Sequence, residues 1–175
     1  GQDVGFDPEF SSKDRADICR MRLKNVNNLM HFEFADAGIS PTLWQASTFP
    51  KSFQSKITVV HEGIDTSILR PKSNISMTLN GNTVLTKKNE VITFVNRNLE
   101  PYRGYHIFMR ALPEVLKRRP KARVLIVGGD GASYGKMHSS GKKWKDIFIS
   151  EIRQNITDAD WSRVSFLGRI PYETF

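Results

Sequence analysis

The 175-residue sequence is poor in cysteine and in long hydrophobic runs. Cys19 is its only cysteine, so an intrachain disulfide cannot form, and the sequence gives no indication of an oxidising compartment. No run approaches the roughly 18 apolar residues that a helix needs to cross a bilayer. We therefore expect a cytoplasmic protein, for which peripheral contact with the inner face of a membrane is the only membrane role left open.

The sequence also lacks the motifs of several enzyme classes. The glycines of residues 127–131 do not follow the G-x-G-x-x-G pattern that opens a helix, and there is no Walker loop, so hydride-transfer enzymes and P-loop NTPases have no specific support. The four histidines have no metal-ligand spacing, and Asp158 and Asp160 are typical of a capped turn. We expect neither a metal site nor a cofactor.

What the sequence does have is positive charge. Its 26 Lys and Arg residues against 18 Asp and Glu residues give a net charge of +8, which favours anionic partners such as nucleotides, nucleic acid or anionic lipid. The basic run 117–123 ends an amphipathic helix, and the run 141–146 falls in a polar loop with few aromatic residues. Nucleic-acid binding is therefore an alternative, but the pattern does not favour it.

The first part of the chain mixes helix and strand signals. Apolar residues at helical spacing predict a helix from about residue 13 to residue 37, ended by Gly38. Residues 39–49 predict a short strand and a turn, and residues 56–65 a buried strand closed by a glycine. Residues 66–89 are polar and read as a linker with a hairpin at the Asn-Gly pair of residues 80 and 81.

From residue 90 onward, strands alternate with helices, which is the pattern of a parallel sheet with crossover helices. The expected strands are 90–96, 122–129 and 163–168, and the expected helices are 104–120 and 144–156. A doubly wound sheet needs more strands and helices on both faces to make a core. We therefore expect either that the first half completes the sheet or, preferably, that the chain is part of something longer.

Ligands of open parallel sheets bind at the carboxyl ends of the strands, where loops and helix N-termini converge. The three expected strands end in arginine and glycine: Arg97, Arg103 and Gly104 after the first, Gly128 and Gly129 in the second, and Gly168, Arg169 and Ile170 at the third. Guanidinium groups beside a helix N-terminus and exposed backbone N–H groups suit a diphosphate. The alternative is that these arginines are solvated surface charges of a basic protein.

Three segments carry a family resemblance: ITVVHEGIDTSILRP at 57–71, ITFVNRNLEPYRGYHIFMRALPEVLKRRPKARVLIVGG at 92–129 and VSFLGRIPYETF at 164–175. In this order they resemble three consecutive blocks of the retaining glycosyltransferases of family 4, which have the GT-B fold. The resemblance implies an α/β fold of GT-B type, with an incomplete Rossmann-like doubly wound parallel sheet and helices on its faces. It implies that residues 1–65 end the acceptor-side domain and include the crossover, that 66–89 form a linker or hairpin, and that 90–175 begin the donor-binding domain.

The resemblance also implies roles for individual residues. Arg97 matches the arginine and Arg103 the lysine of the family's Arg-x5-Lys-Gly signature, which binds the donor diphosphate and stabilises the leaving group. The donor-binding residues it implies are Arg97, Arg103, Gly104, Gly128, Gly129, Arg169 and Ile170, the last two facing the base. His61 and Glu62 depart from the Pro-Asn usual in the crossover. The family's E-x7-E glutamates are expected beyond Phe175, and most of its acceptor domain is expected before Gly1.

The expected function is therefore transfer of a sugar from a nucleotide-diphosphate-sugar to a glycan or glycolipid acceptor with retention of configuration, as in polysaccharide biosynthesis. The arginines would act without a required metal, and the isolated chain is expected to be inactive and to associate with itself through its exposed apolar faces. A nucleotide-binding module without transferase activity is the alternative from a second class.

Overall fold

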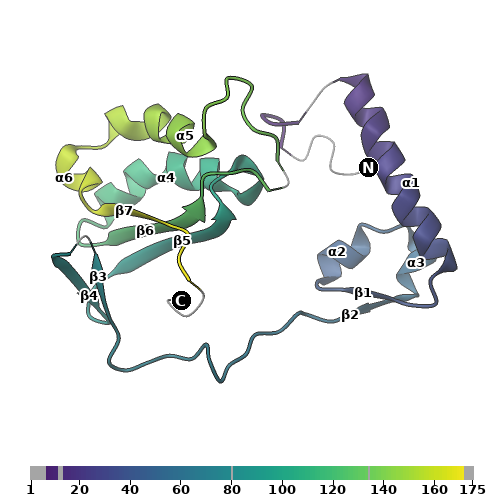
Figure 1. Cartoon of the computed structure of the whole chain (residues 1–175), viewed down its shortest axis with the longest axis horizontal. Coiled ribbons are helices and arrows are strands. Elements are labelled where there is room, and N and C mark those ends of the chain that lie inside the picture. Colours follow the sequence, from purple (N-terminus) through teal and green to yellow (C-terminus); the bar gives the residue numbers. More distant parts are fainter. Residues whose placement is uncertain (1–6, 12–13, 80, 134, 172–175) are drawn as a thin grey trace. The chain divides into compact units, whose positions relative to one another are not determined.

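The computed structural model describes residues 7–11, 14–79, 81–133 and 135–171. Two compact units make up the chain, the N-terminal unit Gly1–Ile68 and the C-terminal unit Leu69–Phe175 (Figure 1). Within the described residues, no helix combines the length with the hydrophobicity that spanning a bilayer requires.

The helices and strands of the N-terminal unit lie between residues 15 and 59. Its elements are α1 (Arg15–Phe34), β1 (Gly38–Ser40), α2 (Leu43–Ser47), α3 (Lys51–Gln54) and β2 (Ile57–Val59). The side chain of Asp14 caps α1 by accepting a hydrogen bond from the Ala16 N–H. The expected long helix is confirmed over residues 15–34, whereas residue 13 lies outside the described residues.

Two predictions for the N-terminal unit need correction. Residues 39–49 were expected to form a strand and a turn, but a short helix, α2, follows β1 because the Thr42 side chain accepts from the Gln45 N–H and caps it. Strand β2 was expected to be buried, but Val59 is 38% exposed. β2 pairs in parallel only with β1, and an apolar run is buried only where other elements cover the faces of its sheet.

The C-terminal unit starts with the predicted hairpin, formed by β3 (Ser76–Leu79) and β4 (Thr83–Thr86) in antiparallel pairing. Its turn includes residue 80, which lies outside the described residues. Leu79 and Leu85 of the hairpin form a buried cluster with Leu125. The hairpin therefore packs against the three-stranded sheet that follows.

The rest of this unit alternates strand and helix, as the sequence predicted. Its elements are β5 (Val91–Asn98), η1 (Pro101–Arg103), α4 (Tyr105–Arg118), β6 (Arg123–Gly129), α5 (Trp144–Ile152), η2 (Arg153–Asn155), α6 (Asp158–Trp161) and β7 (Val164–Gly168). The strands are parallel, in the order β5-β6-β7. An α/β fold with a parallel sheet flanked by helices is thus confirmed.

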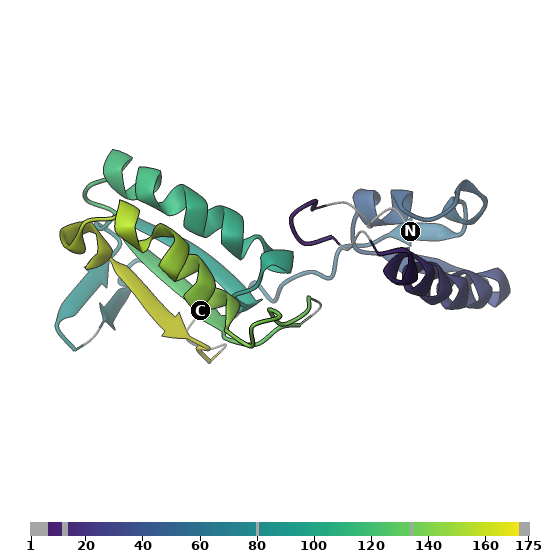
Figure 2. The ribbon, with the colours of Figure 1, turned by 90° about the horizontal axis from the view of Figure 1, so that it is seen from above.

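Helices α4 and α5 lie on the same side of this sheet (Figure 2). The strand order explains why: each crossover moves one strand in the same direction, and right-handed crossovers then place both helices on one face. The core between the helices and the sheet consists of Tyr105, Met109, Leu112, Leu116, Val124, Ile126, Phe148 and Ile152. Parallel strands also end at one edge, so the residues that follow β5, β6 and β7 meet there. We call this edge the rim: residues 97–104, 128–133 and 168–170.

Candidate functional site

Arg97 and Arg103 both lie at the carboxyl end of β5. Arg97 is the second-last residue of the strand, and Arg103 is the last residue of η1, just before α4. Both are exposed, and the Asn96 side chain joins the two segments by donating to the Arg103 carbonyl at 3.4 Å. The structure therefore places the two predicted arginines at the same end of one strand.

Gly104 separates η1 from α4 and has a backbone φ of 74°. A Cβ at this position would meet nothing within 4 Å, so the left-handed backbone, and not crowding, is what favours glycine here. α4 starts at the next residue, and within the described residues no side chain caps it. The partial positive charge of this 14-residue helix therefore faces the rim.

Gly128 and Gly129 allow a close approach of neighbouring groups. A Cβ on Gly128 would lie 2.8 Å from Leu99 Cδ2 and 2.9 Å from the Asn96 carbonyl oxygen. A Cβ on Gly129 would lie only 2.6 Å from Nε of Arg169. Packing against the backbone therefore requires glycine at position 128, whereas a side chain at position 129 would displace the side chain of Arg169.

The Arg169 side chain lies over Gly129 and is held there by a hydrogen bond. Its Nη2 donates to Oδ1 of Asn98 at 3.2 Å. Gly168, with a φ of 67°, turns the chain out of β7 just before Arg169, and Ile170 follows it half-buried. The structure thus connects the ends of β5, β6 and β7 through Asn98, Gly129 and Arg169.

Sequence reasoning missed Asn98 and Glu100, both buried at the rim. Asn98 is 4% exposed and Glu100 is fully buried. The Asn98 Nδ2 donates to Ser133 Oγ at 2.6 Å, and the Glu100 carboxylate accepts from the Ser133 N–H at 3.0 and 3.1 Å. The one available signal was their place directly after an apolar strand, which does not distinguish a buried polar residue from a solvated one.

Asp130, the acidic residue of the GGDG run, pairs with the basic loop before α5. Its carboxylate lies 2.9 Å from Lys143 Nζ and 3.2 Å from Lys145 Nζ. The hydrogen bond from Lys143, together with Lys145, lowers the pKa of Asp130 despite partial burial. Two charges of the basic run 141–146 are therefore paired within the protein.

The arginines of the C-terminal unit differ in their partners. Five of them pair with carboxylates: Arg110 with Glu151, Arg118 with Glu114, Arg119 with Glu90, Arg153 with Asp158 and Arg163 with Asp160. These pairs account for Asp158 and Asp160, and the predicted capped turn is present, with the Thr157 side chain accepting from the Asp160 N–H. Within the described residues, neither Arg97 nor Arg169 has a carboxylate partner.

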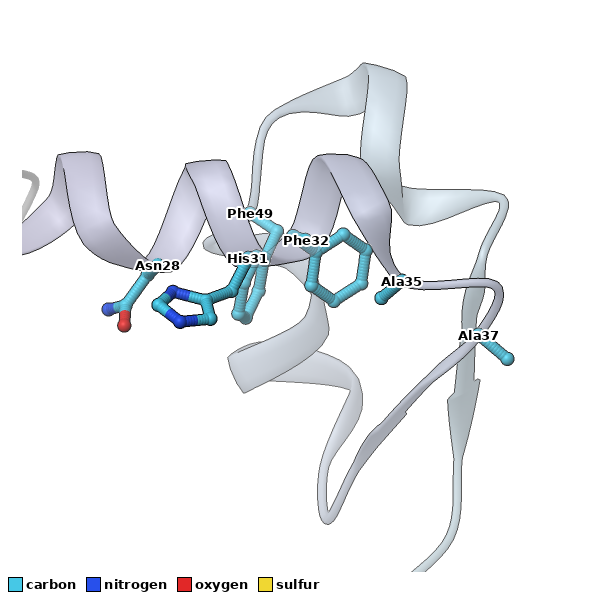
Figure 3. Close-up of a pocket in the computed structure, with 6 residues that line it drawn as sticks. All are labelled: Asn28, His31, Phe32, Ala35, Ala37 and Phe49. Carbon is cyan, nitrogen blue, oxygen red and sulfur yellow. The ribbon is translucent and has the colours of Figure 1, made fainter.

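Two hollows in the described structure are lined by residues outside the rim. One, of about 370 Å³ in the N-terminal unit, is lined by Asn28, His31 and Phe32 of α1 with Ala35, Ala37 and Phe49; Figure 3 shows His31 and Phe32 beside Phe49. The other, of about 790 Å³, is lined by His138, residues 140–143, and Asp146, Ile147 and Ser150 of α5. No predicted site residue lines either hollow.

Comparison with known proteins finds similarity to one family of glycosyltransferases. Residues 1–69 match the model of the Glycosyl transferase family 4 group. This part of the chain is therefore similar to the family 4 glycosyltransferases. This confirms the resemblance seen in the sequence, and the matched residues precede all the predicted site residues of the segment.

A curated relative agrees with this family. The chain is 33% identical over 81 residues to a D-inositol 3-phosphate glycosyltransferase from Segniliparus rotundus. The alignment covers 45% of this chain but only 17% of the relative. The segment therefore corresponds to a small part of that protein.

Proposed function

We propose that this segment belongs to a retaining glycosyltransferase that moves a sugar from a nucleotide-diphosphate-sugar to a glycan or glycolipid acceptor, and that the rim binds the donor. One observation carries the proposal. Five arginines of the C-terminal unit pair with carboxylates, whereas Arg97 and Arg169 at the rim have no such partner among the described residues. Exposed guanidinium groups without carboxylate partners keep their charge available for an external anion.

The chemistry follows from the position of these groups. Cleavage of the sugar–phosphate bond leaves negative charge on the departing diphosphate. Arg97 and Arg103 meet that charge with N–H donors, and the start of α4, which no side chain among the described residues caps, adds its partial positive charge. Arg103 stands where the family usually has lysine, and its planar fork can hold two phosphate oxygens at once. This stabilisation of the leaving group requires no metal ion.

Other parts of the reaction lie outside this chain in the proposal. The acceptor site and the E-x7-E glutamates would be supplied by the rest of a full-length protein in the cytoplasm, at the inner face of the membrane when the acceptor is a glycolipid. The isolated chain would then transfer no sugar and would associate with itself.

Substitution of the two arginines in the full-length protein tests the proposal. Arg97→Ala and Arg103→Ala should each lower kcat by about a hundredfold or more, because each removes a preorganised donor to the leaving group. Arg103→Lys should be the mildest change, since it restores the residue usual in the family. Turnover is measured with a panel of nucleotide sugars, and thermal unfolding checks that each variant folds.

Arg118→Ala is the matched control, since Arg118 lies at the far end of α4 and pairs with Glu114. It should leave turnover unchanged. Near-normal turnover of both rim variants would remove the diphosphate assignment. Binding of nucleotide sugars without any transfer by the full-length protein would instead identify a nucleotide-binding module.

A further inference from the structure

In the part of the chain that the structure describes, the partners of the fully buried Glu100 carboxylate are backbone N–H groups. Its Oε1 accepts from the Ser133 N–H at 3.0 Å, and its Oε2 accepts from the Ser133 N–H at 3.1 Å and the Gly135 N–H at 3.3 Å. Within the described residues no lysine, arginine or histidine pairs with it. An unpaired buried carboxylate is costly, so these N–H groups are what keeps the charge in place.

The chain around the carboxylate is shaped to hold an anion. We call residues 130–135 the glycine loop; residue 134 lies outside the described residues. A Cβ on Gly135 would come within 3.0 Å of Glu100 Oε2, so glycine lets the backbone close on the carboxylate. Backbone N–H groups that converge on an anion are the arrangement by which glycine-rich loops hold phosphate. Here the anion is a side chain of the protein itself.

A second buried residue ties the same loop to the next strand. Asn98 donates from Nδ2 to Ser133 Oγ at 2.6 Å and accepts at Oδ1 from Arg169 at 3.2 Å. The pairing of β5 with β6 shifts register between Val95 and Asn98, which brings Asn98 opposite Gly129. Glu100 and Asn98 thus hold Ser133 by its backbone and its side chain, and Asn98 also holds Arg169.

We propose that Glu100 is a positioning residue of the donor site. Its carboxylate takes the place of an external anion inside the glycine loop, and through Ser133 and Asn98 it keeps Arg169 over Gly129 before any ligand binds. The inference rests on the proposed function. The inference also limits which groups can bind the diphosphate. Because the N–H groups of Ser133 and Gly135 are bonded to Glu100, the diphosphate would contact Arg97, Arg103 and Arg169.

Amide hydrogen exchange and a nucleoside diphosphate titration, both followed by NMR on the 175-residue chain, test this role separately. Glu100→Ala should speed exchange of the Ser133 and Gly135 amides at least about tenfold, while strand β6 stays protected. A hydrogen bond to a charged group contributes about 1.5–3 kcal/mol, and about 1.4 kcal/mol corresponds to a tenfold change in an equilibrium constant. Added acetate should restore protection by filling the space left by the carboxylate, and acetamide should not. Glu100→Gln, which keeps the volume, repeats the exchange measurement if the alanine variant fails to fold.

The titration uses UDP and GDP and follows the amides of residues 97, 129 and 169. Loss of Glu100 should weaken binding by about tenfold, with acetate restoring it. Glu114→Ala, which removes an exposed carboxylate from α4, is the control and should change neither measurement.

Unchanged exchange at Ser133 and Gly135 in both Glu100 variants would overturn the proposal, and so would faster exchange with unchanged nucleotide affinity. If the wild-type chain binds neither UDP nor GDP, the proposed function fails and the positioning role fails with it. In that case the exchange result still shows whether Glu100 holds the loop.

Discussion

The two units both contain helices and strands, but they differ greatly in how many of their residues are buried. In the C-terminal unit, α4 buries Tyr105, Met109, Leu112 and Leu116. In the N-terminal unit, the longer helix α1 buries no residue, and within its described residues the unit as a whole buries only Ser40. Helical length and apolar content therefore do not by themselves make a core.

The distribution of apolar residues explains the difference. The buried residues of α4 recur every three or four positions and face one sheet of three strands, each five residues or longer. The apolar residues of α1 lie on two faces. Ile18, Met21 and Leu29 are half-buried, whereas Leu23, Val26, Met30 and Phe34 are exposed. With only the three-residue strands β1 and β2 in its sheet, the N-terminal unit has no surface broad enough to cover both faces.

The largest expected effect contrasts one substitution in the two long helices. Leu112→Ala should lower the free energy of unfolding by about 2–5 kcal/mol, because Leu112 is 1% exposed and its loss leaves a cavity. Leu23→Ala should change it by less than about 0.5 kcal/mol, because Leu23 is 67% exposed. Urea denaturation measures both. An equal loss in the two variants would show that the exposed face of α1 is covered in solution.

A second contrast uses two crowded glycines. Gly128→Ala should lower the free energy of unfolding by about 1–3 kcal/mol. The new Cβ would collide with the backbone oxygen of Asn96, which cannot move without shifting β5. Gly38→Ala in the N-terminal unit should lower the free energy of unfolding by less. Its Cβ would meet the Phe32 ring at 2.7 Å, but that ring is only half-buried and can shift. Thermal unfolding ranks the two, and the reverse order would contradict this difference in packing.

The core of the C-terminal unit also holds the hydroxyl group of Tyr105. The buried Tyr105 hydroxyl has no hydrogen bond within the described residues, so Tyr105→Phe should stabilise the C-terminal unit by about 1 kcal/mol at pH 7. A loss of stability at pH 7 would reveal a partner for the hydroxyl.

The same residue gives stability a pH dependence. Burial first, then the charges of Asp146 and Asp130, raise the pKa of Tyr105 above its ordinary value of 10.0. The folded state therefore keeps a proton that the unfolded state releases near pH 10. The contribution of Tyr105 to the free energy of unfolding is constant below pH 10, and stability falls as the pH rises above 10. Urea denaturation from pH 9 to 11 should show this fall in the wild type and a smaller one in the phenylalanine variant.

The smallest expected effects are those of exposed ion pairs, for which the two units should be alike. Arg118→Ala breaks the pair with Glu114 on α4, and Arg20→Ala breaks the pair with Asp17 on α1. Each should change the unfolding free energy by at most about 0.5 kcal/mol, because solvent and salt screen exposed charges. Denaturation at low and high salt measures both. A large effect in one unit alone would mean that factors besides core burial separate them.

Local signals were enough to predict most of the C-terminal unit. The alternation of strands and helices, the hairpin at residues 80 and 81 and the break at Gly104 all depend on period and on turn residues, which act over a few positions. The same signals placed Arg97, Arg103, Gly128 and Arg169 at strand ends, where the parallel sheet then gathers them at one rim. The donor roles of these residues stay predictions.

Burial and polar partners could not be predicted in this way. Strand β2 has the apolar residues of a buried strand, yet its exposure depends on what covers its sheet. The partners of Glu100 lie 33 and 35 residues further along the chain. No local pattern indicates that Ser133 and Gly135 will turn their N–H groups toward it.

By itself, the sequence determined where helices, strands and turns form and which charged and small residues stand at their ends, because these follow from hydrogen bonding and backbone geometry over a few neighbouring residues. Only the tertiary structure decided which apolar faces are covered, that Arg110 and Arg119 pair with carboxylates far away in the sequence, and that the glycine loop closes around Glu100. These outcomes require groups distant in the chain to meet, and the free energy of each depends on how much water their meeting removes.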